Sequence, residues 1–225
     1  MIDRTISPPA LRRRPEHNRK SFLRAPVFGL SLFFSLPLIP GIAQDQHVLW
    51  QIGQKDHDDK EFALSPNNWS HYGDDSYYIV GKSKPETDWT YVQPGPDDNW
   101  AGNLTHTANI DFVLDHAVTD GSCRLTIAFV DTHSAAPPKL EIRVNDKSWT
   151  EQTVQGAGDA SLDGQPSHGK PSEITVEFPA QLLKTGANSV QIVNAHGSWV
   201  IYDAVTLTSP DGDTLGTPAN IFKVN

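Results

Sequence analysis

Cysteine, long apolar runs and positive charge are all scarce in this chain of 225 residues, and each shortage excludes a class of protein. The one cysteine, Cys123, can form no disulfide within the chain and excludes a cysteine-based metal site. It lies in an alternating apolar stretch, where a free thiol packs as a small hydrophobe. The longest apolar run, residues 27–39, is shorter than the ~20 residues that a membrane-spanning helix needs. A hydrophobic core alone therefore has to stabilise the fold.

The shortage of positive charge bears on the partners. The chain has 18 Lys and Arg against 27 Asp and Glu, which gives a net charge of −9 at pH 7. Seven of the basic residues fall within residues 1–43, so the rest of the chain is more acidic still. Binding to nucleic acid or to anionic lipid relies on clustered cations. We therefore expect neither as a partner, whereas a neutral sugar or a divalent cation is compatible with this charge.

Sequence patterns that mark common catalytic sites are missing as well. None of the nine histidines stands in an HExxH or His-x-His arrangement, and there is no GxSxG elbow, P-loop or dinucleotide fingerprint. Glycosidases use two facing carboxylates about 5–10 Å apart, but nothing among the 27 acidic residues singles out such a pair. We expect no catalytic residue in this chain. The enzyme alternative is a small polysaccharide lyase or glycosidase.

Residues 1–43 have the pattern of a secretory signal peptide. A basic stretch that includes residues 12–14 precedes the apolar run, and the small residues Gly41 and Ala43 suit a signal peptidase site. This pattern predicts a secreted or periplasmic protein that has no membrane segment once the signal is cleaved. An uncleaved N-terminal anchor is the alternative.

The remainder of the chain has the pattern of short strands. In residues 140–144, Leu140, Ile142 and Val144 alternate with polar residues, which is typical of a half-buried β-strand. Clusters of Gly, Pro, Asn and Asp between such runs predict turns. The predicted strands are residues 47–52, 77–80, 109–114, 124–130, 140–144, 174–178, 190–193 and 199–207.

This series of strands predicts an all-β fold, a jelly-roll β-sandwich of two antiparallel sheets with one short helical turn at residues 179–184. We expect a single domain over residues 44–209. A polar C-terminal tail follows at residues 210–225. We also expect a monomer.

Aromatic residues among loop-forming residues give the main functional indication. Three of the six tryptophans and four tyrosines fall within residues 62–106, amid Pro, Gly, Asn and Asp. A flat ring can stack on the apolar face of a sugar while neighbouring polar groups bond its hydroxyls. We therefore expect a carbohydrate-binding module that binds polysaccharide by aromatic stacking. The predicted carbohydrate-binding residues are Trp69, Asp88, Trp89, Tyr91, Asp97, Trp100, Asn103 and His106.

The alternative is that these loops fold over the edge of the sandwich and bury their own aromatic rings. The chain would then be a structural or docking domain, or a fragment of a polysaccharide lyase. Acidic clusters such as residues 56–61 suggest a structural calcium ion, since calcium takes six to eight oxygen ligands from such loops. Their spacing lacks the glycine of an EF-hand loop, so the sequence singles out no metal ligands.

Several motifs together resemble one known family. They are the segment 49–64 (LWQIGQKDHDDKEFAL), the segment 88–91 (DWTY), the pair 144–145 (VN), and the segments 158–169, 182–188 and 197–207. In this order they resemble the C-terminal domain, domain III, of rhamnogalacturonan lyases of polysaccharide lyase family 4. The resemblance covers most of residues 48–207.

The resemblance implies a jelly-roll, carbohydrate-binding-module-like domain without the catalytic domain. In those lyases the catalytic Lys and His belong to a separate domain, so no catalytic residue is carried over to this chain. The implied partner is a pectin-like or other plant or algal polysaccharide. Members of the family tend to have an Arg in the loop after the Gly-Asp stretch, whereas residues 161–164 here read SLDG. This departure argues against recognition of an acidic galacturonate backbone.

Overall fold

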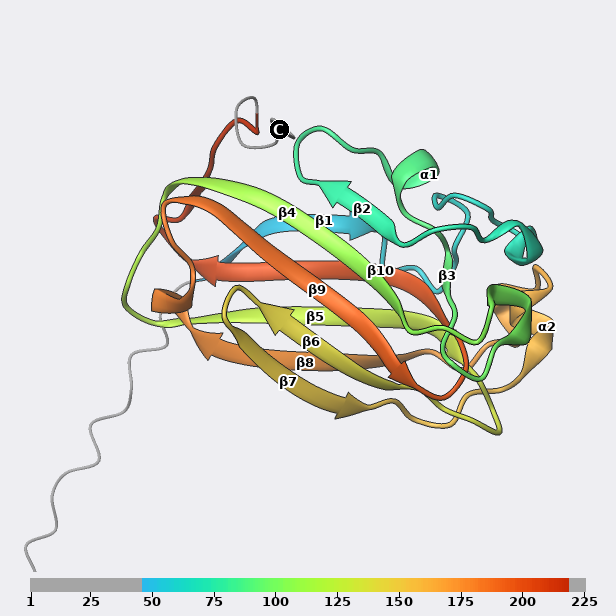
Figure 1. The fold of residues 1–225 in the computed structure, drawn as a ribbon. Coiled ribbons are helices and arrows are strands. Elements are labelled where there is room, and N and C mark those ends of the chain that lie inside the picture. The colour runs from blue at the N-terminus through green and yellow to red at the C-terminus, as the bar shows by residue number, and fades with distance from the viewer. Residues whose placement is uncertain (1–45, 219–225) are drawn as a thin grey trace, which may run out of the picture. The chain divides into compact units, whose positions relative to one another are not determined.

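The computed structural model describes residues 46–218, which fold into two β-sheets packed face to face (Figure 1). Strands account for 47% of the described residues and helices for 12%, which confirms the all-β prediction. The predicted leader, residues 1–43, lies outside the described residues. Within residues 46–218, no helix is long and apolar enough to cross a membrane.

The first sheet is built around two long central strands. Its order is β1 (Gln46–Gly53), β10 (Val200–Pro210), β5 (Ser122–Thr132) and β8 (Ser172–Pro179), and the short β3 (Val92–Gln93) also pairs with β10. All these pairings are antiparallel.

The second sheet lies across the first, and β9 crosses in front of β10 in Figure 1. Its order is β11 (Thr214–Leu215), β4 (His106–His116), β9 (Gly186–His196), β6 (Lys139–Val144) and β7 (Lys147–Gln152), and β2 (Ser76–Ile79) also pairs with β4. The β2–β4 pairing is parallel, which departs from the predicted antiparallel pattern. Successive strands from β8 to β10 alternate between the two sheets, as in a jelly roll.

The core lies between the two sheets and is built from alternate residues of facing strands. Ile110 and Phe112 of β4 and Ile192 of β9 point inward and are fully buried, as are Leu125 and Ile127 of β5. Burial of these apolar side chains is the main favourable term in folding. All eight predicted strand regions fall within observed strands or overlap them.

Three strands were missed because their sequences carry little alternation. The edge strand β7 has one inward apolar residue, Trp149, which packs on Phe178 with ring centroids 5.8 Å apart. β3 and β11 are only two residues long. Since β11 pairs with β4 and Pro210 still belongs to β10, the described part of the predicted tail packs on the sandwich.

The loops between the described strands contain six single-turn helices. The predicted turn at residues 179–184 is a 3-10 turn, η4 (Ala180–Leu182). The other five were not predicted, because turns of three or four residues are too short to show a hydrophobic period. They are η1 (Trp69–His71), α1 (Pro85–Asp88), η2 (Asn99–Ala101), α2 (Asp159–Leu162) and η3 (Pro166–His168).

The loop that carries α2 and η3 is held by one buried carboxylate. Asp131, near the end of β5, is fully buried, and its Oδ1 accepts hydrogen bonds from the N–H groups of Ala157 (2.9 Å) and Lys170 (3.2 Å). Its Oδ2 accepts a bond from Ser161 Oγ at 2.6 Å. Gly156 lies so close to the strand that an added Cβ would stand 1.7 Å from the carbonyl oxygen of Thr132. The loop therefore depends on Asp131 for its attachment.

We expect Asp131→Ala to lower the free energy of unfolding by about 2–4 kcal/mol, because four donors would lose a buried acceptor. Urea unfolding followed by tryptophan fluorescence measures the change. Asp120→Ala, at an exposed turn position, is the control and should shift stability by less than about 0.5 kcal/mol. Equal shifts for both variants would contradict this role of Asp131.

Candidate functional site

Two of the predicted contact residues, Trp89 and Tyr91, are core residues. Both are 0% exposed. The Trp89 ring lies edge-on to Tyr202 with ring centroids 5.0 Å apart, and the Tyr91 hydroxyl donates to the carbonyl of Leu162 at 2.8 Å. Neither ring can stack on a sugar, so for these two residues the prediction was wrong. The physical reason is that β3 pairs with β10, which draws the preceding residues between the sheets.

A third predicted residue, His106, is only 7% exposed and has protein partners at both ring nitrogens. Nδ1 lies 3.1 Å from Asp75 Oδ1, and Nε2 lies 3.1 Å from the carbonyl oxygen of Ala101. Asp75 Oδ1 also accepts the backbone N–H of Thr107 at 3.0 Å. His106 therefore joins two loops to the start of β4, and bonding a sugar hydroxyl would require one of these contacts to break.

Trp69 and Trp100 keep part of their surface exposed while packing on the core. Their rings meet edge-on, with centroids 5.1 Å apart and an interplanar angle of 69°. Tyr72 lies edge-on to Trp100 and to His106, with centroid distances of 6.4 Å and 4.8 Å. We call Trp69, Tyr72, Trp100 and His106 the aromatic cluster. Because its two indoles are not coplanar, it offers ring edges and one partial face rather than a flat row.

The three remaining predicted residues are all exposed but do not share one loop. Asp97 and Asn103 flank η2 beside Trp100, and Asn103 Nδ2 donates to the carbonyl of Pro96 at 3.1 Å. Asp88 ends α1, where its Oδ2 accepts the backbone N–H of Lys84 at 2.8 Å. The structure thus brings Asp97 and Asn103 to the aromatic cluster, whereas the Asp88 side chain bonds the backbone at the start of α1.

Next to the aromatic cluster lies a hollow of about 610 Å³ that the sequence did not predict, here called the Tyr77 groove. Tyr77 and Leu104 are 66% and 60% exposed, so two large apolar side chains face water in one concave place. A signal for Tyr77 was present, because adjacent residues of a strand point to opposite faces and one of the tyrosines at 77 and 78 had to face outward. The groove is lined by Gly73, Asp74, Asp75, Tyr77, Leu104, Thr105 and His106.

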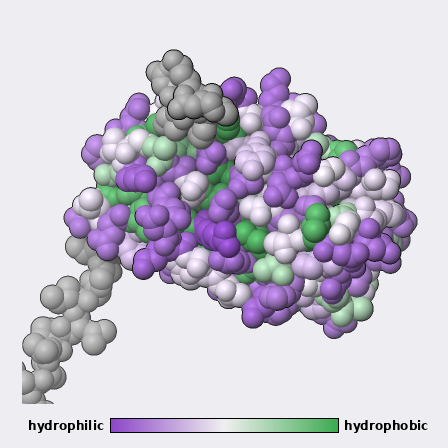
Figure 2. Space-filling view, viewed as in Figure 1, coloured by the Kyte–Doolittle hydropathy of each residue, from purple (hydrophilic) through white to green (hydrophobic). Residues whose placement is uncertain are grey.

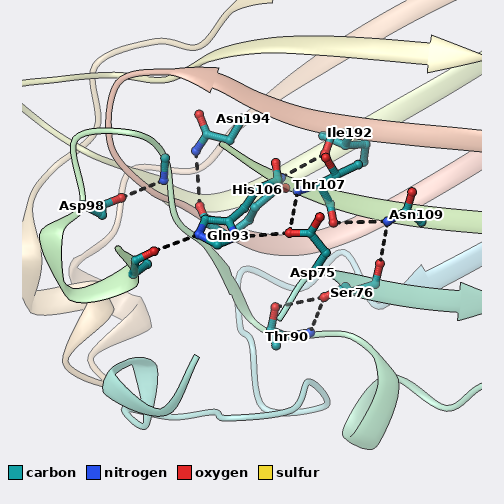
Figure 3. Close-up of polar contacts among 12 residues, drawn as sticks. Asp75, Ser76, Thr90, Gln93, Asp98, His106, Thr107, Asn109, Ile192 and Asn194 are labelled. Atoms are coloured by element: carbon teal, nitrogen blue, oxygen red, sulfur yellow. Dashed lines mark hydrogen bonds and ion pairs between the residues drawn. The ribbon is translucent and has the colours of Figure 1, made fainter. Parts of the chain in front are cut away.

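A buried polar network lies beneath the groove (Figure 3). Gln93 Nε2 donates to the carbonyl oxygens of His106 (2.7 Å) and Ile192 (2.9 Å), and its Oε1 accepts the Tyr202 hydroxyl. One amide thereby joins β3 and β10 of the first sheet to β4 and β9 of the second. Both N–H groups of the amide donate a hydrogen bond, and its oxygen accepts one. A buried amide bonded in this way gives the groove a rigid base.

Carboxylates of the acidic loop after β1 are engaged in hydrogen bonds with the protein. Within the loop, Asp58 Oδ1 accepts the N–H groups of Asp59 and Lys60. The loop backbone is also held by Asp203 of β10, whose Oδ1 accepts the N–H of His57 at 3.0 Å. Within residues 46–218, no group of three His, Cys, Asp or Glu side chains is placed to hold a metal ion. The calcium ion suggested by the sequence stays a prediction.

Asp59 is the one carboxylate of this loop that is fully withdrawn from water. It is buried, its Oδ1 accepts Ser65 Oγ at 2.9 Å, and its Oδ2 has no hydrogen-bond partner. Desolvation, together with the nearby charges of Asp58 and Glu61, raises the pKa of Asp59 to about 6. Ionising Asp59 therefore opposes folding at neutral pH.

Comparison with known proteins gives a consistent set of relatives. The family described as "CBM-like: Polysaccharide lyase family 4, domain III" matches residues 48–207. A rhamnogalacturonate lyase of Dickeya dadantii (strain 3937) is 28% identical over 171 residues, which are 73% of this chain and 28% of that lyase. The chain therefore spans well under a third of the length of this relative.

Two solved structures of carbohydrate-binding modules are also similar. A family 35 module from an environmental isolate is 16% identical, with 51% of this chain and 72% of the module covered and a TM-score of 0.36. The family 35 module of Cellvibrio japonicus Abf62 is 15% identical, with 50% and 70% covered and a TM-score of 0.31.

We expect Asp59→Asn to flatten the pH dependence of stability. A folded-state pKa raised from 3.8 to about 6 leaves stability intact below pH 4, lowers it as pH rises from 4 to 6, and leaves a constant loss above that range. The loss is about 3 kcal/mol if the whole shift is expressed. The measurement is the difference in unfolding free energy between variant and wild type at pH 4, 5, 6 and 7.

That difference should grow in favour of the variant up to pH 6 and then stay constant. Using the difference removes any pH-independent cost of the new amide. Asp120→Asn, which is exposed, should show no such trend. A difference that stays flat between pH 4 and 7 would rule out a buried, uncompensated charge at Asp59.

Proposed function

This chain belongs to the carbohydrate-binding-module-like domain III family of polysaccharide lyase family 4, and on that premise we propose that it binds polysaccharide, without catalysis, at the Tyr77 groove. The exposed pair Tyr77 and Leu104 is the observation that carries the proposal. Exposed apolar surface gathered in a hollow is typical of ligand sites, whereas apolar residues scattered singly need no explanation.

The groove combines the groups that a sugar requires. The ring of Tyr77 offers an apolar face, with a hydroxyl at its edge that can donate or accept. Asp74 is exposed beside it, and Thr105 adds another hydroxyl. These groups can bond the equatorial hydroxyls of a pyranose while its apolar face lies on the tyrosine ring.

The aromatic cluster supports the groove from one side. His106 belongs to both, and through Tyr72 it is in contact with Trp100. The partly exposed edge of Trp100, with Asp97 and Asn103 on the same loop, extends the surface that a bound chain could contact. Stacking against Trp100 is thus secondary to stacking on Tyr77 in this arrangement.

The ligand class and the location follow from other observations. The Dickeya relative is a rhamnogalacturonate lyase, which supports a plant-type, pectin-associated polysaccharide as the partner. The basic stretch and apolar run within residues 1–43 support export. In this proposal the chain works as a monomer outside the cytoplasm, where such polysaccharides are met.

Affinity electrophoresis in gels that contain single polysaccharides tests the proposal. We expect retardation on at least one plant polysaccharide. For Tyr77→Ala we expect a dissociation constant about tenfold higher. The loss of an apolar contact worth about 1.5 kcal/mol corresponds to that factor. Trp100→Ala should weaken binding by a smaller factor.

The matched control is Val48→Ala, which removes an exposed apolar side chain from β1 of the other sheet. It should bind as the wild type does. Far-UV circular dichroism checks that each variant is folded. Absence of retardation on every polysaccharide, or equal retardation of Tyr77→Ala and wild type, would contradict binding at this groove.

A further inference from the structure

The outer face of the second sheet carries an ordered row of side chains. Register pairs Tyr77 of β2 with Asn109 of β4, Asn109 with Gln191 of β9, and Gln191 with Arg143 of β6. The neighbours of these residues along each strand, such as Ile110 and Ile192, point into the core. The four side chains therefore stand side by side on the face turned away from the first sheet.

The side chains at the two ends of the row are more exposed than the two in its middle. Tyr77 and Arg143 are exposed, whereas Asn109 is only 9% exposed and Gln191 is half-buried. Gln191 Nε2 donates to Asn109 Oδ1 at 2.9 Å, which holds both amides down against the sheet. Three strand spacings separate the backbones of the two end residues, a distance of about 14 Å. We call the strip of less exposed side chains between these two ends, along β4 and β9, the trough.

Each end of this trough opens into a hollow. The Tyr77 groove lies at the beginning of β4, beside Thr105 and His106. A second hollow of about 270 Å³ lies farther along the same strand, beside Asp111 of β4 and Ser189 of β9. His106 and Asp111 are five residues apart on an extended strand, which corresponds to about 17 Å. The second hollow is lined by Asp111, Asn145, Asp146, Lys184, Ala187, Asn188 and Ser189.

We propose that this trough binds the interior of a neutral glycan chain, which lies along β4 and β9 from the Tyr77 groove to the second hollow. The inference rests on the proposed function and adds to it the charge, the direction and the minimum length of the ligand. A site closed at one end would select a chain terminus, whereas a trough with a hollow at each end accepts a chain that continues in both directions.

The charges along the path select a neutral ligand. Carboxylates stand at both ends: Asp74 and Asp75 in the first hollow, Asp111 and Asp146 in the second. Arg143, at the rim, is held by Glu141 through two bonds of 2.8 Å, so its charge is compensated within the protein. Among the residues that line the two hollows, Lys184 is the one permanent cation. A chain of uronates would meet like charge at each end.

The floor suits hydroxyl groups. The amide oxygen of Gln191 and the hydroxyl of Ser189 can bond a ligand's hydroxyls, whereas the Asn109 amide is held by Ser76, Thr107 and Gln191. Figure 2 shows that hydrophilic side chains cover most of the face seen there, with small hydrophobic areas between them. Planar amides bonded to each other are already positioned, which lowers the entropy lost when a chain binds.

Calorimetry with oligosaccharides of two to six units tests the proposal. The probes are neutral arabino-, galacto- and gluco-oligosaccharides and, for comparison, oligogalacturonates of the same lengths. We expect the affinity for at least one neutral series to rise at least tenfold from two to five units. Oligogalacturonates should bind at least tenfold more weakly than that series.

Two variants locate the path. Gln191→Ala removes part of the floor, and Ser189→Tyr obstructs the way to the second hollow while leaving the backbone bonds of β9 in place. Each should weaken binding of the five-unit ligand at least fivefold and leave the two-unit ligand unaffected. Thr126→Ala, on the outer face of the first sheet, is the matched control and should change neither.

The outcomes separate this inference from the proposed function. If affinity does not rise beyond two units and both variants bind like wild type, while Tyr77→Ala still weakens binding, the trough is wrong and the groove remains. Equal binding of oligogalacturonates would overturn the neutral ligand. If no saccharide binds and no polysaccharide retards the wild type, the proposed function itself fails.

Discussion

The side chain of Gln93 joins the two sheets at the end of the sandwich where the Tyr77 groove lies. Its amide donates to carbonyl oxygens of β4 and β9 and accepts the hydroxyl of Tyr202 on β10. A buried amide of this kind is stabilising only when its bonds are satisfied, and here each partner belongs to a different strand. Because β3 pairs with β10 in the first sheet, the preceding segment is drawn inward, and the loop that follows β3 borders the groove through Leu104 and Thr105.

That constraint explains how the aromatic residues divide. Trp89 and Tyr91 precede β3 directly and become part of the core, whereas Trp69 and Trp100 lie farther from it and keep an exposed edge. Both sets stand among Pro, Gly, Asn and Asp in the sequence. Burial therefore depends on distance from the strand that enters the sheet, and the composition of a loop does not reveal it.

A rigid sheet that presents a polar outer face is a suitable base for a binding module. The ordered backbone of β4 and β9 spaces the groups on that face at regular intervals, so a ligand bound there would cost little conformational entropy of the protein. Domain III of polysaccharide lyase family 4, to which this chain belongs, is carbohydrate-binding-module-like by description. The separation of a polar outer face from a mainly apolar interior gives that description a physical basis in this chain.

The alternation of apolar and polar residues determined the strands, since it is a local property: Leu140, Ile142 and Val144 face the core as their spacing predicts. The β-sandwich followed from that series of strands, whereas the family resemblance followed from motifs such as residues 49–64 and 197–207. Tertiary structure alone decided that Trp89 lies on Tyr202, more than a hundred positions away, and that Tyr77 rather than Tyr78 faces water. It also decided that Asp75 reaches His106. Those outcomes depend on which distant segments share one face of a sheet, and neighbouring residues carry no record of that.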